Sequence, residues 1–330
     1  MRTLPTLVAA ISAAALIAGC GSSTTDSGAP FPRNGATVEW VVPSAAGAGN
    51  DILARIMAPA MENELGVPVK VVNKEGGSQV VGLNYLANAK PDGETIGFTN
   101  IPSILGRYLD PSKKAGFDRE SFLPIGSFAS NDIVIGVNKS SPYKNIAELF
   151  DAVKANPGSI TVGTDSRAGD DHVNLRTLED TLGLDFNIVH YNSGADKISA
   201  LVSGETDFAL GGVSSFYGQF ASGEVNILSV LTEEQNKLIP EVPTLASEGY
   251  DAPFMTNNFA ISAPAGTPDA TMTTLQNALE TALADPAVAE KLTGAATQPD
   301  WVSGADVATL WEQRETEIEP IIAELLADQQ

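Results

Sequence analysis

A loop of small residues between two ordered segments carries the clearest chemistry in this sequence. Residues 43–51 read PSAAGAGND, between an apolar run at 38–43 and a helical pattern that starts at Asp51. In a parallel sheet such a loop lies at the carboxyl edge, where ligands bind. Gly47 and Gly49 let the backbone come close to a ligand, and the N–H groups of the first helical turn then face it. The loop therefore predicts an anion site at a helix N-terminus.

Two other interpretations of the loop remain open. A dinucleotide-binding fingerprint needs a third glycine, and Ile52 stands at that position. The second alternative is that the loop is a turn that binds no ligand.

Residues that enzymes use for catalysis are sparse. His172 and His190 are the only histidines, and the chain has no GxSxG or HExxH motif and no cysteine spacing typical of a metal site. A triad of Ser166, His172 and Asp170 can be written down, but nothing in the spacing favours it. The sequence therefore predicts a protein that is not an enzyme and uses no metal or cofactor, with a secreted hydrolase as an alternative.

Cys20 is the single cysteine of the 330 residues, and it directly follows Ala18 and Gly19. A basic start and a run of apolar or small residues over 4–18 precede it, which suits a secretory signal and is too short for a stable membrane span. A cysteine at this place resembles the lipidated first residue of a bacterial lipoprotein; an export signal with a chance cysteine is the alternative. We expect a lipoprotein signal over 1–20, a flexible tether over 21–35, and a protein anchored by lipid at Cys20 on the extracytoplasmic side of the membrane.

The charge balance is strongly acidic, because 41 Asp and Glu residues face 19 Lys and Arg residues and give a net charge of −22. Such a body repels phosphate backbones, so nucleic acid is not an expected partner. At 43% hydrophobic residues the chain is globular, and its length suffices for two domains. No apolar run after Cys20 approaches the ~20 residues of a membrane span.

Strand-like and helix-like runs alternate along most of the chain, which is typical of parallel sheets with crossover helices. The expected strands are residues 38–43, 67–72, 95–99, 160–163, 188–191, 208–210, 227–231 and 259–263. The expected helices are residues 51–65, 78–88, 145–155, 170–182, 195–202, 268–284 and 305–326, with a shorter one opening at Asp285. An apolar stretch over 122–137 lacks a convincing helical pattern.

The ordered motifs resemble the receptors of tripartite tricarboxylate transporters, the Bug family. The similarity rests on VVPSAAGAGND followed by ARIMA, on VPVKVVNKEGG, on NPGSITVGTDSRAGDDHVNL, on LIPEVPTLASEGY and on LADPAVAEKL. Each motif is weak by itself, but their order matches the family over nearly the whole chain after Cys20.

The resemblance implies an α/β, two-lobed Venus-flytrap fold with a hinge of two crossover strands. One domain would comprise residues 36–130 and 258–330, and the other residues 131–257. The loop 164–172 would face the loop 44–51 across the cleft, with a further helix start at 191–194 and a strand end near 213–215. The implied ligand-binding residues are Ser44, Ala45, Gly47, Gly49, Asp51, Gly77, Asn100, Thr164, Asp165, Ser166, Arg167, Gly169, His172, Tyr191, Asn192 and Ser214.

The chain departs from the family pattern in the second loop. Asp165, Asp170 and Asp171 stand where small hydroxyl residues are usual, and Asn258 replaces a frequent tryptophan. Three acidic side chains would repel a plain dicarboxylate unless a cation compensates. Arg167 either clasps the ligand carboxylate or pairs with a neighbouring aspartate. An amino-bearing acid or a metal–citrate complex would suit the loop better.

The resemblance implies a monomeric solute receptor that captures a small organic anion, such as a di- or tricarboxylate including citrate, and delivers it to a membrane permease. A lipoprotein that senses a ligand and signals to a membrane kinase is the alternative.

Overall fold

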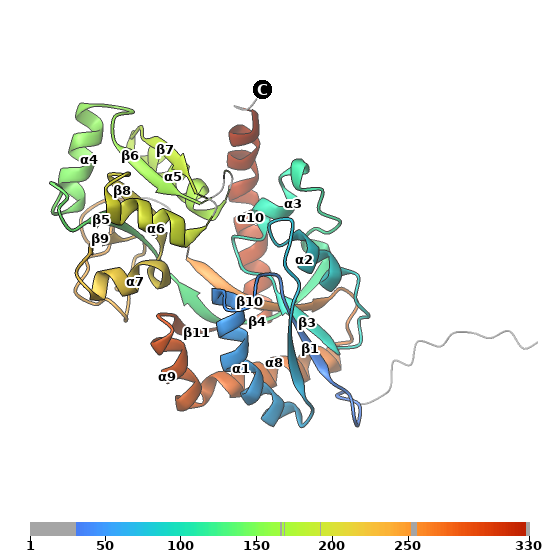
Figure 1. Cartoon of the computed structure of the whole chain (residues 1–330). Helices are drawn as coiled ribbons and strands as arrows, with labels where there is room; N and C mark the ends of the chain where they lie inside the picture. The colour runs from blue at the N-terminus through green and yellow to red at the C-terminus, as the bar shows by residue number, and fades with distance from the viewer. Residues whose placement is uncertain (1–30, 166, 168, 192, 252–255, 328–330) are drawn as a thin grey trace, which may run out of the picture.

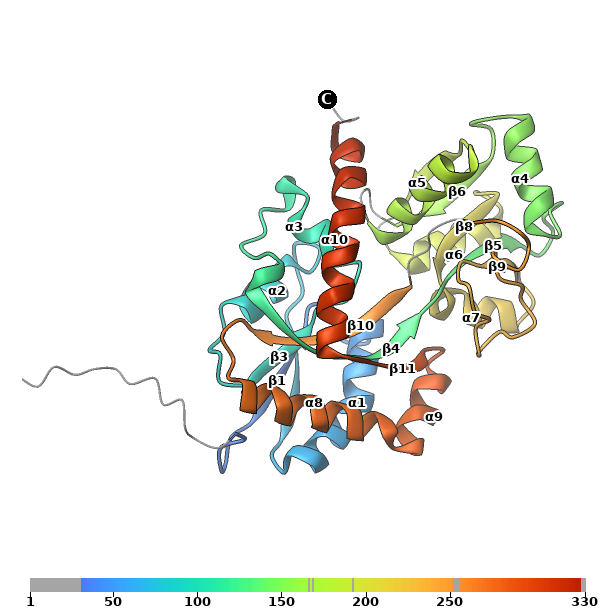
Figure 2. The ribbon, with the colours of Figure 1, turned by 180° about the vertical axis from the view of Figure 1, so that it is seen from behind.

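The computed structural model describes residues 31–165, 167, 169–191, 193–251 and 256–327. Its strands form two separate sheets, of six and five strands. Each sheet with its helices forms one lobe, and the two lobes lie side by side in both views (Figure 1, Figure 2). The expected two-lobed α/β flytrap fold is confirmed.

The first sheet has the order β11-β4-β10-β3-β1-β2. Parallel strands form one half, and antiparallel pairing joins them to the other half. The strands are β1 (Val38–Val42), β2 (Val69–Asn73), β3 (Thr95–Phe98), β4 (Phe122–Asn131), β10 (Asn257–Pro264) and β11 (Gln298–Ser303). The helices and short turns of this lobe are α1 (Gly49–Leu65), α2 (Val80–Ala87), α3 (Leu105–Tyr108), η1 (Pro111–Lys113), η2 (Arg119–Ser121), α8 (Asp269–Ala284), α9 (Pro286–Gly294) and α10 (Gly304–Ala327).

Side-chain alternation along the strands places a core on each face of this sheet. Val38, Trp40 and Val42 point to one face and pack with α1, α8 and α9. The other face is covered by α2, α3 and α10, whose buried residues include Trp311. The sheet is therefore held between two helical layers, with its loops free at the strand ends.

The second sheet has the order β7-β6-β8-β5-β9. β6 is parallel to β7 and β8, whereas β5 is antiparallel to β8 and β9. Its strands are β5 (Ile133–Asn138), β6 (Thr161–Thr164), β7 (Asn187–His190), β8 (Phe208–Gly212) and β9 (Val225–Val230). Its helices are α4 (Ile146–Ala155), α5 (Asp170–Leu182), α6 (Gly194–Ser203) and α7 (Val213–Ala221). α4 and α5 pack with one apolar cluster, and α6 and α7 pack with another.

The chain crosses between the sheets twice, and the two crossings touch. It leaves the first sheet at the end of β4 and enters β5 through Asp132, and it returns at Thr256 into β10. The buried Asp132 carboxylate accepts hydrogen bonds from Thr256 Oγ1 at 3.0 Å and from Asn236 Nδ2 at 2.8 Å. These bonds hold the two crossover segments together at the junction of the lobes.

The elements agree with the sequence-based expectation only in part. α5 has the expected bounds, and α10 continues as a helix through Pro320. The apolar stretch at 122–137 forms β4 and β5. Helix α7 and strand β11 were not expected; α7 begins where a strand was expected to end, near Ser214.

Candidate functional site

The loop before α1 is closed by the carboxylate of Asp51. This carboxylate accepts the Gly47 N–H at 2.8 Å and Asn73 Nδ2 at 2.9 Å, and it pairs with Arg55 at 2.9 Å. The hydrogen bond from Arg55 is the main cause that lowers the pKa of Asp51 to about 2. Asp51 is only 3% exposed, so its carboxylate holds the loop in shape, and the ligand contact expected of Asp51 stays a prediction.

The N-terminus of α1 itself is open. Its N-cap is Ala48, which has no side chain that could accept a hydrogen bond. Within the described part of the chain, the N–H groups of Gly49 and Asn50 meet no acceptor. A Cβ added at Gly49 would meet nothing within 4 Å. The first turn therefore offers free donors at the positive end of a 17-residue helix, as an anion site requires.

The neighbouring residues of the first loop lie around this helix start. Ala45 is exposed, and Ser44 is half-buried with its carbonyl bonded to Asn73 Nδ2 at 3.1 Å. Gly47 has a φ of +83°, which favours glycine there. Gly77 precedes α2, whose Gly82 lies directly against Pro43, with a built Cβ 2.8 Å from the Pro43 Cα. The starts of α1 and α2 are thus brought to the same edge of the sheet.

Two separate sets of side-chain hydrogen bonds flank the loop after β3, one at the first turn of α1 and one at the first turn of α5. Asn100 Nδ2 donates to Asn50 Oδ1 at 3.0 Å, in the loop that follows β3. Three residues later, Ser103 Oγ accepts from Asn257 Nδ2, which also approaches Asp170 Oδ2, each at 3.2 Å. Asn257 at the second crossover therefore touches both lobes.

Asn100 was expected at the site, whereas Ser103 and Asn257 were not. Ser103 lies three residues after Asn100, and Asn257 directly precedes Asn258, so both are close in sequence to residues named from the sequence. Asn258 is buried, and its backbone pairs with Ile101.

The loop before α5 contains one buried ion pair and two further acids. Lys197 of α6 binds the carboxylate of Asp171 and donates to the Leu210 carbonyl at 2.6 Å, and both charged side chains are buried. Burial raises the pKa of Asp171 to about 6, against the opposing effect of Lys197. Burial, then the charges of Asp171 and Asp170, raise the pKa of Asp165 well above its usual range. Lys197 thus forms its ion pair with Asp171, and its charge opposes the rise in the pKa of Asp165 only in part.

Gly169 and Thr164 shape this loop. A side chain at Gly169 would collide with the Asp165 carboxylate, at 2.1 Å from Oδ2 to a built Cβ. Thr164 is buried, and its Oγ1 lies 3.0 Å from Nδ1 of His190, which also lies 2.9 Å from the Asp165 carbonyl.

His172 is part of the packing of the second lobe. It is 2% exposed, and its ring centre lies 4.6 Å from that of His190. Burial, followed by the neighbouring His190, lowers the pKa of His172 to about 4. The structure therefore buries His172 against His190, and the ligand contact expected of His172 stays a prediction.

Arg167 contacts the first lobe and not a neighbouring aspartate. Its Nη1 donates to the backbone carbonyl of Leu325 at 3.2 Å, near the C-terminus of α10. A guanidinium there also meets the negative end of that helix. The expected pairing with Asp170 or Asp171 is not present between these described residues.

The remaining expected residues lie on other strand ends. The Tyr191 hydroxyl donates to Glu205 at 3.0 Å. Ser214 at the start of α7 exchanges two hydrogen bonds with Asn131, at 2.9 and 3.1 Å, beside the first crossover. Ser166 and Asn192 lie outside the described residues, as does Cys20.

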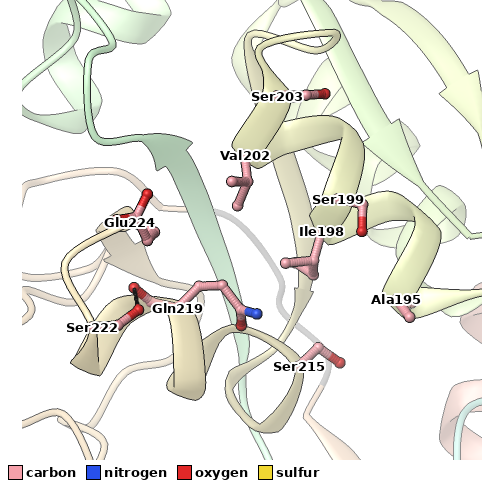
Figure 3. Close-up of a pocket in the computed structure, with 10 residues that line it drawn as sticks. Ala195, Ile198, Ser199, Val202, Ser203, Ser215, Gln219, Ser222 and Glu224 are labelled. Carbon is pink, nitrogen blue, oxygen red and sulfur yellow. Dashed lines mark hydrogen bonds between the residues drawn. The ribbon is translucent and has the colours of Figure 1, made fainter.

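A separate hollow of about 740 Å³ lies between α6 and α7 (Figure 3). Ile198 and Val202 form its apolar wall, and Ser199, Ser215 and Gln219 surround them. It borders the start of α6 but includes neither the first loop nor Asp165 and Asp170. Its mixed lining shows no concentration of charge that would select an ion.

The described residues include neither a metal-binding cluster nor a membrane-spanning helix. No three His, Cys, Asp or Glu side chains among them gather in a way that could hold a metal ion. None of the helices described between residues 31 and 327 combines the length and apolarity needed to cross a membrane.

Known proteins and solved structures resemble this chain over most of its length. A UPF0065 protein of Bordetella pertussis is 28% identical over 325 residues, covering 97% of each chain. A solved TctC solute binding protein from Polaromonas has a TM-score of 0.77 at 22% identity, covering 89% of this chain and 100% of that one. MatC from Rhodopseudomonas palustris, solved with bound malate, has a TM-score of 0.73 at 22% identity, covering 87% and 98%.

The model of the tripartite tricarboxylate transporter family receptor matches residues 53–326, which is most of the chain. The fold, the order of the motifs and this match agree. The chain belongs to the tripartite tricarboxylate transporter receptor family, a family of solute-binding proteins.

Proposed function

We propose that this protein is an extracytoplasmic receptor that captures a small carboxylate between its lobes for a tripartite transporter and catalyses no reaction. The observation that carries the proposal is the open N-terminus of α1, where Ala48 provides no cap and Gly49 leaves space for a ligand. Two solved structural neighbours, MatC with bound malate and Rpa4515 of R. palustris with adipate, support a carboxylate ligand.

In this proposal the first lobe binds the carboxylate and the second lobe closes over it. Ser44, Ala45 and Gly49 line the helix start, and Asn100 lies beside it through its bond to Asn50. The second lobe contributes its strand-end loops, including Asp165, Gly169 and Tyr191, with Thr164 positioned behind them. Gly47 and Asp51 act by holding the first loop, and Ser214 by its bonds to Asn131.

Calorimetry with malate, adipate, citrate and amino acids tests the proposal, with small-angle scattering as the readout of lobe closure. Micromolar binding together with a smaller radius of gyration is the expected result. A ligand at 100 times its Kd should also stabilise the protein by ~2.7 kcal/mol. Turnover of ester or amide substrates would instead indicate the hydrolase alternative and contradict a receptor.

We also propose that Cys20 is lipidated and anchors the receptor near its permease subunits. The Cys20→Ser variant should leave the membrane fraction or accumulate unprocessed, because the multiple acyl chains of a lipoprotein provide the stable anchor. Recovery of the Cys20→Ser variant in the membrane fraction at the wild-type level would contradict the lipid anchor while leaving the receptor function intact.

A further inference from the structure

The two helix starts that meet near the crossover differ in charge. The first turn of α1 has free N–H groups, and its only acid, Asp51, is neutralised by Arg55. The first turn of α5 carries Asp170 and Asp171, with Asp165 beside it. Acids at a helix N-terminus cancel its positive end, so α5 does not offer a second anion site.

Asp165 and Asp170 share a side-chain hydrogen bond, yet three buried side-chain oxygens around them have no donor in the part of the chain that the structure describes. Asn174 is 2% exposed, and its Nδ2 donates to the Asp170 carbonyl at 2.9 Å, which directs its amide toward the start of α5. Its Oδ1 is buried and has no hydrogen-bond partner among the described residues. The same holds for Oδ1 of Asp165 and for Oδ1 of Asn257, which reaches in from the crossover.

The two cationic side chains near this loop, Lys197 and Arg167, already have hydrogen-bond partners. Lys197 is bound to Asp171 and to the Leu210 carbonyl. Arg167 is bonded to Leu325 of α10. Buried acceptors without donors cost free energy, so this part of the site requires a group that brings donors and positive charge.

We infer that the ligand is a zwitterion, whose carboxylate binds the first turn of α1 and whose ammonium group binds Asp165 and Asp170 at the start of α5. An ammonium group supplies three N–H donors and a full positive charge. A second carboxylate at this place would face two acids and several lone pairs. The inference rests on the proposed receptor function and specifies the chemical class of its ligand.

Matched ligand pairs test the inference with the wild-type protein. Aspartate differs from malate by an ammonium group in place of a hydroxyl, and 6-aminohexanoate differs from adipate by a protonated aminomethyl group in place of a carboxylate. The expected result in calorimetry is at least tenfold tighter binding of the ammonium member of whichever pair fits the site. Equal or tighter binding of malate or adipate, or a requirement for citrate with a divalent cation, would overturn the inference while supporting a receptor.

Isosteric variants locate the ammonium site. Asp165→Asn and Asp170→Asn should each weaken binding of the ammonium ligand more than tenfold and leave binding of its anionic partner unchanged or improved. Asp180→Asn is the matched control, because Asp180 lies on the same helix but is exposed at its far end, and it should change neither affinity. Thermal unfolding shows whether each variant is folded.

Unchanged selectivity in folded Asp165→Asn and Asp170→Asn proteins would overturn the assignment. Failure of the wild-type protein to bind any ligand of a broad carboxylate and amino acid screen would instead contradict the proposed receptor function itself.

Discussion

The guanidinium of Arg167 in the second lobe donates a hydrogen bond to the backbone carbonyl of Leu325 in the first lobe, at 3.2 Å. A second bond joins α5 to α10, from Arg176 Nη2 to Glu324 Oε1 at 2.8 Å. Between them, Val173 is buried in the apolar cluster that contains Ile322. The C-terminal end of α10 is therefore joined to α5. This contact between the lobes is separate from the two crossovers (Figure 1).

Replacement of Arg167 by alanine should change ligand affinity less than threefold. Its guanidinium binds a helix carbonyl, and an exposed contact of this kind contributes about 0–1 kcal/mol to folding. Calorimetry with the ligand and urea unfolding measure the two effects. A loss of affinity above 30-fold, or ~2 kcal/mol, would show that Arg167 moves to clasp the ligand carboxylate.

A valine at Gly49 should weaken ligand binding more than tenfold, or ~1.4 kcal/mol. The space beside Gly49 is open, so the side chain fits the protein but occupies the place of the ligand. Gly294→Val is the control, since Gly294 also has open space but lies at the end of α9. Gly47 is less suitable, because any side chain at its φ of +83° adds backbone strain. Normal affinity of a folded Gly49→Val protein would place the carboxylate elsewhere.

Asp51→Ala should lower the free energy of unfolding by about 2 kcal/mol, because it removes the acceptor of three donors, one of them charged. The pKa of Asp51 is lowered from 3.8 to about 2 in the folded state. Its contribution is therefore complete above pH 4 and disappears as the pH falls through 2.

Asp269→Ala is the control for this variant, because Asp269 is also in a first helical turn but is exposed. It should cost less than about 1 kcal/mol, the usual effect of the helix dipole. Equal losses in urea unfolding of the two variants would show that the bonds of Asp51 contribute little.

Two adjacent residues of α5 should give opposite pH dependences of stability. The pKa of Asp171 is raised from 3.8 to about 6, so its titration lowers stability as the pH rises through this interval. The pKa of His172 is lowered from 6.5 to about 4, so its titration raises stability over nearly the same interval. In the wild-type protein these two effects should partly cancel.

Substitution of either residue should expose the effect of the other. Asp171→Asn should make the unfolding free energy rise more steeply between pH 4 and 6, and His172→Gln should make it fall. Urea unfolding at half-unit pH steps measures the slopes. Identical slopes in the wild-type protein and both variants would contradict the buried environments of these groups.

Much of the fold could be predicted where the chain carries local signals. Helix α5 ends at Gly183, whose φ of +64° suits the glycine that the sequence places there. Helix α4 begins after Asn145, whose side chain caps it by accepting the Glu148 N–H. The end of α5 and the start of α4 could therefore be predicted from the sequence.

Other features depend on partners far along the chain and left no local signal. Helix α7 has Gly212 as N-cap with no side-chain bond, and β11 contains proline and is held by pairing with β4. The Arg167 contact joins residues 158 positions apart. The helix start of α1 could be predicted from its glycines, but the engagement of Asp51 with Asn73 could not, because tertiary packing decides which acid faces inward.

The hydrogen bond between Asp132 and Thr256 holds the two ends of the second-lobe segment next to each other. All five strands of the second sheet lie on one continuous segment that leaves and rejoins the rest of the chain at this single point. A segment with adjacent ends can be exchanged as a unit without rearranging the remainder. Recombination between relatives at these two positions would then place a new second lobe opposite an unchanged α1.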